Sequence, residues 1–118
     1  MLIFKIFRRP EWNDLKSAGQ TLGAPIDLAD GYIHFSTAAQ VAETAAKHFA
    51  DQSDLVLVAV EAGTLGADLK WETSRGGALF PHLYRALTLA DVLWDKSLPL
   101  GASGHIFPEL HLFPGAQR

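Results

Sequence analysis

The chain of 118 residues is 48% hydrophobic and 19% charged and contains no cysteine, which excludes a disordered chain, disulfides and thiolate metal sites. Ten Lys and Arg against 13 Asp and Glu give a net charge of −3, and the scattered basic residues argue against a nucleic-acid or anionic-membrane surface. No apolar stretch approaches the ~18 residues that a membrane span requires.

The length is typical of one domain that buries about two-thirds of its surface. We predict a single domain over residues 1–118, with its core at about residues 2–96 and an irregular C-terminal tail over residues 97–118. The first charges follow the apolar start of the chain, whereas a signal peptide carries them before it, so we expect a cytoplasmic protein.

The first part of the chain predicts a strand, a helix and a loop. The β-branched and aromatic run Leu2–Phe7 is typical of a strand that enters a core. A short helix is expected between Pro10 and Gly19, with Trp12 and Leu15 on its buried face. The following residues 19–30 are rich in Gly, Asp and Pro, which predicts a long surface loop.

The middle of the chain contains the clearest helix and the clearest strand. Tyr32–Phe35 is a brief strand-like run. Thr37 and Gln40 form a capping box, and apolar residues then repeat at helical spacing as far as Ala50. Leu55–Val60 is apolar without alternation, which predicts a central strand covered on both faces.

The second half predicts further short strands at Leu69–Glu72, Phe80–Tyr84 and Asp91–Trp94, with a mobile glycine-containing loop over residues 73–78. Pro81 makes its strand an expected edge strand. Strands interleaved with only two helices, and without βαβ alternation, predict an α+β class with small mixed or antiparallel sheets.

One histidine lies in the segment DGYIHFST, directly before a predicted helix. Alternation puts Tyr32 and His34 on one strand face. The unpaired N–H groups at a helix N-terminus bind anions such as phosphate, so we predict that His34, Ser36 and Thr37 contact a phosphorylated ligand. The alternative is that Ser36 and Thr37 only cap the helix, while His34 bonds a backbone carbonyl.

A second histidine lies in FPHLY. His82 and Tyr84 are two residues apart and face the same way on a strand, which places an imidazole beside a phenol. Glu72, at the end of the preceding strand, is placed to orient a histidine or a ribose hydroxyl. The alternative is an edge strand with ordinary polar residues and a solvated Glu72.

The remaining histidines predict no metal site. The chain lacks HExxH and every tight pair of metal ligands, and the spacing of His105 and His111 is not that of a metal site. His48 is expected to be a surface or structural residue of its helix. We therefore expect no metal cofactor.

Several of these segments together resemble a known family. IFKI with Glu11-Trp12, DGYIHFST with Gln40, LKWE and FPHLY look like the bacterial and plant family catalogued as domain of unknown function 952. The resemblance runs from about Leu2 to Leu93. That family is grouped by fold with the ADP-ribosyltransferases, which bind NAD in a cleft between two small sheets.

The resemblance implies an ADP-ribosyltransferase-like fold and three cleft motifs. Lys5 corresponds to the basic residue of the first strand, Ile33–Thr37 to the second motif, and His82 to the position near the catalytic glutamate of the third. The expected catalytic residues are then His34 and His82. The expected substrate-binding residues are Lys5, Ser36, Thr37, Glu72 and Tyr84.

Two functions follow from this resemblance. The first is an ADP-ribosyltransferase-like transferase that takes NAD, or a related nucleotide, as its small-molecule partner. The alternative is a non-catalytic module that binds a nucleotide or a phosphorylated metabolite. The absence of the third-motif glutamate favours this alternative, because that glutamate stabilises an oxocarbenium-like transition state by its charge. A purely structural role is the third hypothesis.

Overall fold

A computed structural model describes residues 1–110 of the chain. Among these residues there are three α-helices: α1 (Arg9–Ala18), α2 (Pro25–Asp30) and α3 (Val41–His48). The longer strands are β1 (Leu2–Arg8), β5 (Leu55–Glu61), β6 (Leu69–Thr73), β7 (Leu79–Leu83) and β9 (Val92–Leu98). The two-residue strands are β2 (Gln20–Thr21), β3 (Ile33–His34), β4 (Ser36–Thr37), β8 (Leu87–Thr88), β10 (Leu100–Gly101) and β11 (Gly104–His105). Short 3₁₀ turns span Ala62–Asp68, Arg75–Gly77 and Leu89–Asp91.

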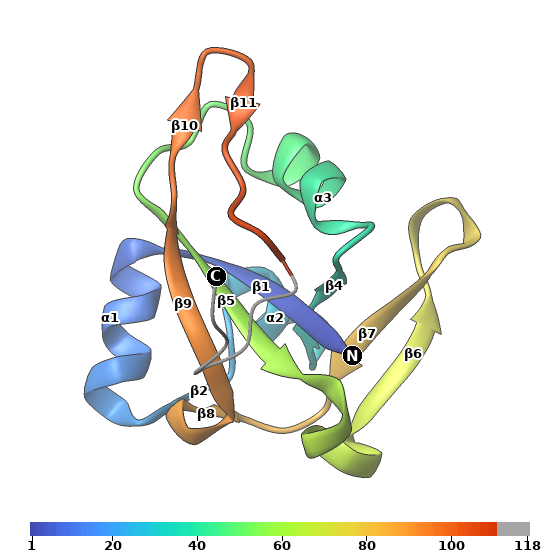
Figure 1. Cartoon of the computed structure of the whole chain (residues 1–118). Coiled ribbons are helices and arrows are strands. Elements are labelled where there is room, and N and C mark those ends of the chain that lie inside the picture. The colour runs from blue at the N-terminus through green and yellow to red at the C-terminus, as the bar shows by residue number, and fades with distance from the viewer. Residues whose placement is uncertain (111–118) are drawn as a thin grey trace.

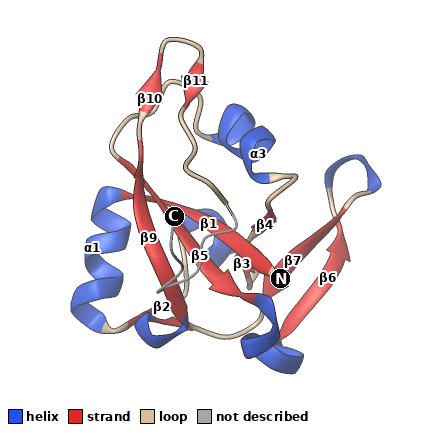
Figure 2. Cartoon of the chain, in the orientation of Figure 1, coloured by secondary structure: helices blue, strands red, loops and turns tan. Residues whose placement is uncertain are grey.

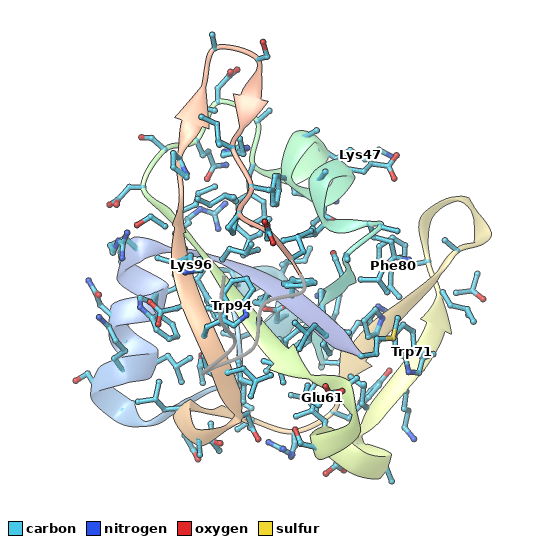
Figure 3. All side chains as sticks on the ribbon, viewed as in Figure 1. Lys47, Glu61, Trp71, Phe80, Trp94 and Lys96 are labelled. Atoms are coloured by element: carbon cyan, nitrogen blue, oxygen red, sulfur yellow. The ribbon has the colours of Figure 1, made fainter. Side chains whose placement is uncertain are left out.

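The strands form two main antiparallel sheets (Figures 1 and 2). The larger has the order β4-β1-β5-β9, and the smaller has the order β3-β7-β6. The β6–β7 hairpin projects from the body of the molecule, and Phe80 and Trp71 lie on this arm (Figure 3). Phe35 is the single residue between β3 and β4, so the chain passes from the smaller sheet to the larger one at this point. The α+β class with small antiparallel sheets is confirmed.

The hydrophobic core occupies both faces of the larger sheet. On one face, Ile3 and Phe7 of β1 pack with Trp12 and Leu15 of α1. On the other face, the alternate residues of β1 pack with α3. The strand β5 is buried along almost its whole length, which confirms the predicted central strand with two covered faces. The predicted helix between Pro10 and Gly19 is also confirmed, and Gly19 ends it with φ of 84°.

The long loop predicted for residues 19–30 is wrong. This segment contains β2 and the helix α2. Pro25 lies at the first position of the helix, and the Asp27 carboxylate accepts the N–H of Ala24 at 2.7 Å. Gly31 ends α2 in the left-handed conformation. The residues that predicted a loop are therefore the capping residues of a short helix.

The capping role predicted for Thr37 is also wrong. The helix α3 begins at Val41, its N-cap residue is Gln40, and Thr37 belongs to β4. Only half of the capping box is present, because Gln40 Oε1 accepts the N–H of Thr37 at 3.0 Å. Thr37 instead pairs with Ile3 of β1. Pairing with the larger sheet thus takes precedence over helix capping at this residue.

The edge strand predicted from Pro81 is wrong. Pro81 lies in β7, the central strand of its sheet. Its carbonyl accepts the N–H of Phe35 at 3.0 Å. The N and O of one strand residue point to the same side, so the missing N–H of Pro81 also points toward Phe35, beyond the end of β3. The proline therefore removes no hydrogen bond from the ladder with β6.

The predicted irregular tail begins later than expected. β9 continues to Leu98, and β10 and β11 form a small hairpin. Phe107 and Leu110 pack against the core on the α3 face of the larger sheet. The prediction of an irregular tail is therefore wrong for residues 97–105, and residues 111–118 lie outside the described part of the chain. None of the helices within residues 1–110 is long and apolar enough to span a bilayer.

Candidate functional site

A cavity of about 370 Å³ opens along one edge of β1. The ladder between β1 and β4 includes only Ile3 and Phe4, so the edge of β1 from Lys5 to Arg8 has no strand partner among the described residues. This space is bordered by α2 on one side and α3 on the other, and His34 and His82 close one end. The cavity thus exists because β4 is only two residues long.

His34 and His82 lie side by side at this end of the cavity. The two residues are directly opposite each other in the antiparallel pair of β3 and β7, so their side chains project from the same face of the sheet. Their ring centroids are 5.4 Å apart and the rings are inclined at 70°. Tyr32 stacks on His82, with 4.1 Å between centroids, and it also contacts His34. The structure therefore brings together the two predicted catalytic residues.

Both ring nitrogens of His34 face carboxylates. Nδ1 is 2.5 Å from Asp27 Oδ1, and Nε2 is 2.9 Å from Asp30 Oδ2. A neutral imidazole has only one N–H, so both contacts are hydrogen bonds at the same time only when the ring carries two protons. The two carboxylates therefore fix the orientation of the His34 ring. The alternative in which His34 bonds a backbone carbonyl is not observed.

Asp27 is the hydrogen-bonding centre of this part of the site. Its buried carboxylate accepts hydrogen bonds from Lys5 Nζ at 2.7 Å and from the backbone N–H of Ala24. It also accepts from His34, through the backbone N–H and through the ring Nδ1. Burial raises its pKa, but the hydrogen bond from His34 and the charge of Lys5 outweigh burial, so the pKa of Asp27 is lowered. A Cβ at Gly23, which has φ of 103°, would collide with this carboxylate.

Lys5 borders the cavity, but its ammonium group is committed to Asp27. The side chain is almost fully buried, and Nζ lies 2.7 Å from Asp27 Oδ2. Burial lowers the pKa of Lys5, and the adjacent carboxylate opposes this shift. The arrangement is a buried ion pair that fixes α2 to β1. The predicted substrate-binding role of Lys5 is not tested by this geometry.

His82 is oriented by Glu72. Its Nδ1 is 2.8 Å from Glu72 Oε1, and the same oxygen accepts the hydroxyl of Tyr84 at 2.7 Å. These hydrogen bonds lower the pKa of Glu72, and the bond from Tyr84 to Glu72 raises the pKa of that phenol to about 12. Of the two uses considered for Glu72, orientation of a histidine is the one observed. Glu72 and Tyr84 do not border the cavity but lie behind His82.

The second nitrogen of His82, Nε2, remains available to the cavity. Nε2 has no hydrogen bond to any described residue. Every fully buried side-chain polar atom of the described residues does have a hydrogen-bond partner. Nε2 is therefore not fully buried, and the His82 residue borders the cavity. Since Glu72 accepts a proton at Nδ1, Nε2 of neutral His82 is the unprotonated nitrogen.

The two hydroxyl residues of the second segment differ in position. Ser36 borders the cavity, and its Oγ is 2.8 Å from Thr44 Oγ1 of α3. Thr37 does not border the cavity, and its N–H is bound by Gln40. Ser36 is therefore placed for ligand contact, whereas Thr37 is not.

Some residues of the site were not predicted from the sequence, namely Arg8, Asp27, Thr44 and His48. Asp27 had a usable signal, because Pro25 and Gly31 mark the two ends of a short helix. His48 had been expected to be a surface or structural residue, and it borders the cavity. Among residues 1–110, no group of three or more His, Asp or Glu side chains is arranged to hold a metal ion.

Comparison with known proteins places the chain in a family. The family described as protein of unknown function (DUF952) matches residues 6–95. The chain belongs to this family. Two crystal structures of protein CC0527 from Caulobacter crescentus, the parent and a double mutant, are similar to this chain, with sequence identities of 54% and 53% and TM-scores of 0.86. Each comparison covers 89% of this chain and 92% of the other. The solution structure of CC0527 is 55% identical, with a TM-score of 0.80, and covers 88% and 90%.

The DUF952 match includes most of the site described above. His34, His82, Glu72 and Asp27 all lie between residues 6 and 95, whereas Lys5 lies just before the matched region. No curated protein matches the chain.

Proposed function

We propose that this DUF952 protein is an acid–base enzyme that binds NAD or a related nucleotide in the cavity and acts as an ADP-ribosyltransferase-like transferase. One observation supports this most directly. Two histidine rings lie 5.4 Å apart at one end of the cavity, and each is oriented at Nδ1 by a carboxylate. Such pairing is a common way to fix the tautomer and position of a catalytic imidazole.

In this proposal the two histidines have different roles. Nε2 of His82 is unprotonated when the ring is neutral, so His82 is the general base. His34, whose ring nitrogens face Asp27 and Asp30, instead holds Asp30 at the bound substrate. The different surroundings of the two histidines thus give them different roles in the proposed reaction.

For NAD the proposed step is a displacement at the anomeric carbon of the nicotinamide ribose. The bond between this carbon and the nicotinamide nitrogen breaks, and its electron pair neutralises the ring nitrogen. A bond forms to the oxygen of water or of an acceptor hydroxyl, and His82 takes the proton of that oxygen. In the cavity, the carboxylate nearest to these histidines is Asp30. Its negative charge is placed to stabilise an oxocarbenium-like carbon.

The test is the release of nicotinamide from NAD, measured by chromatography with the wild type and with His82→Gln. We expect His82→Gln to lower the rate by at least ~100-fold, the size of a general-base contribution. The NAD-induced rise in melting temperature should remain, because binding stabilises the folded state whether or not turnover occurs. His105→Gln is a matched control, since the His105 ring bonds the carbonyl of Gln52 and lies outside the cavity.

The second candidate is a non-catalytic nucleotide-binding module. It is favoured by the position of Glu72, whose carboxylate is bound to His82 and Tyr84 and does not face the cavity. For this candidate, NAD raises the melting temperature and no nicotinamide appears at any pH between 5 and 8. If NAD neither raises the melting temperature nor is cleaved, both nucleotide proposals are wrong.

A further inference from the structure

The cavity is a groove between two rows of side chains. Alternate residues of a strand point to the same face, and residues three and four apart on a helix share a face. The strand row consists of Phe4, Ile6 and Arg8 of β1, and the helix row of Val41, Thr44 and His48 of α3. A strand rises about 3.3 Å per residue, so the strand row is ~13 Å long from Phe4 to Arg8.

The two ends of this groove have different chemistry. Phe4 is paired with Ser36 and lies toward the end that carries His34 and His82. Arg8 forms the other end, where its guanidinium group lies over the ring of Phe49 at 5.1 Å. Between the ends, the side chains of Ile6 and Val41 are apolar. A ligand that fills the groove would therefore contact the two imidazoles at one end, apolar side chains in the middle and Arg8 at the other end.

Arg8 retains donors for an anion. Its Nε donates to Gln52 at 3.1 Å, and its Nη1 lies 3.4 Å from Glu11 Oε2, a long contact. Nη2 has no hydrogen bond to the described residues, and 45% of the side chain is exposed. A guanidinium carries five N–H donors in a planar fork, which suits the two oxygens of a phosphate or a carboxylate. Stacking on Phe49 fixes the plane of this fork.

We infer that the groove takes an elongated ligand with an aromatic or aliphatic body, and that Arg8 binds an anionic group of this ligand. The apolar body lies between β1 and α3. In a nucleotide the anion is a phosphate, and in another metabolite it is a carboxylate. The inference deepens the proposed function by naming a specificity-determining residue, and it rests on that function only for the reacting end of the ligand.

The first test uses two fluorescent probes that differ by one anionic group. 8-Anilinonaphthalene-1-sulfonate has an aromatic body and a sulfonate, and N-phenyl-1-naphthylamine has the same body without it. We expect Arg8→Gln to weaken sulfonate binding at least about tenfold, as for the loss of a charge-assisted contact, and to leave the neutral probe unchanged. Arg9→Gln is the matched control, since Arg9 bonds Asp54 and Ser97 and does not border the cavity.

A third variant locates the probes. Thr44→Phe fills the middle of the groove, and both probes should lose affinity if they bind there. The inference is overturned if the sulfonate probe fails to bind the wild type, if it binds Arg8→Gln as well as the wild type, or if Thr44→Phe, confirmed as folded by circular dichroism, affects neither probe.

The second test separates this inference from the nucleotide proposal. Nicotinamide mononucleotide and nicotinamide riboside differ by one phosphate, and calorimetry gives the affinity of each. If Arg8→Gln lowers the affinity of the mononucleotide to that of the riboside, both proposals stand. If neither nucleotide binds while Arg8→Gln still weakens the sulfonate probe selectively, the nucleotide proposal fails and the anion-binding role of Arg8 stands. If the mononucleotide binds Arg8→Gln and wild type equally, the role of Arg8 is wrong.

Discussion

Lys5 and Asp27 form a buried ion pair between β1 and α2, with 2.7 Å between Nζ and Oδ2. Removal of one charge of such a pair leaves the other without compensation. We therefore expect Asp27→Asn to lower the free energy of unfolding by about 3–5 kcal/mol, measured by urea denaturation. Asp30→Asn is the control: Asp30 is partly exposed, and its contact with His34 should contribute less than about 1 kcal/mol. A loss below 1 kcal/mol in Asp27→Asn would contradict this.

The same carboxylate predicts a dependence of stability on pH. The pKa of Asp27 in the folded protein is lowered from its ordinary value of 3.8, so its ionisation favours the folded state. This contribution is fully present above the ordinary value and is lost as the pH falls through the lower folded pKa. The difference in unfolding free energy between wild type and Asp27→Asn should therefore decrease between about pH 5 and pH 2. A difference that stays constant over this range would show that the charge of Asp27 is not responsible.

Glu72 and Tyr84 predict a shifted phenol titration. The hydrogen bond to Glu72 raises the pKa of Tyr84 to about 12 from 10.0. In Glu72→Gln this pKa should return toward 10, measured by the ultraviolet absorbance of the phenolate in a Tyr32→Phe background. The raised pKa favours the folded state below pH 10, and this contribution is lost as the pH rises from 10 to about 12. Circular dichroism at each pH shows whether the folded protein is being titrated. Equal titration in both proteins would mean that the hydrogen bond is absent in solution.

Gln40 and Thr37 contribute differently to the start of α3. Gln40 accepts the N–H of Thr37 at 3.0 Å and donates to the carbonyl of Leu79 at 2.8 Å, whereas the Thr37 side chain does not cap the helix. We expect Gln40→Ala to cost about 1 kcal/mol and Thr37→Ala less than about 0.5 kcal/mol in unfolding free energy. Thermal and urea unfolding of both variants provide the comparison. The reverse order would support the capping role that the sequence pattern alone suggests.

The sequence by itself determined the elements that local patterns specify. An unbroken apolar run can only be a doubly covered strand or a buried helix, so β5 is evident in Leu55–Val60. The limits of α1 follow from Pro10 and Gly19, because the first fixes a helical φ and the second accepts a left-handed one. The grouping of His34 and His82 was predicted from a family resemblance. The structure places them opposite each other.

Only the tertiary structure decided where the cavity lies and which groups orient its histidines. The cavity depends on the point at which the pairing of β1 with β4 ends, and no local pattern specifies a long-range register. The role of Asp27 depends on the short helix α2, which brings its carboxylate to Lys5 of β1 and His34 of β3. Short elements with few apolar residues carry little periodic signal, and their placement is decided by the ion pairs and hydrogen bonds that they form with distant parts of the chain.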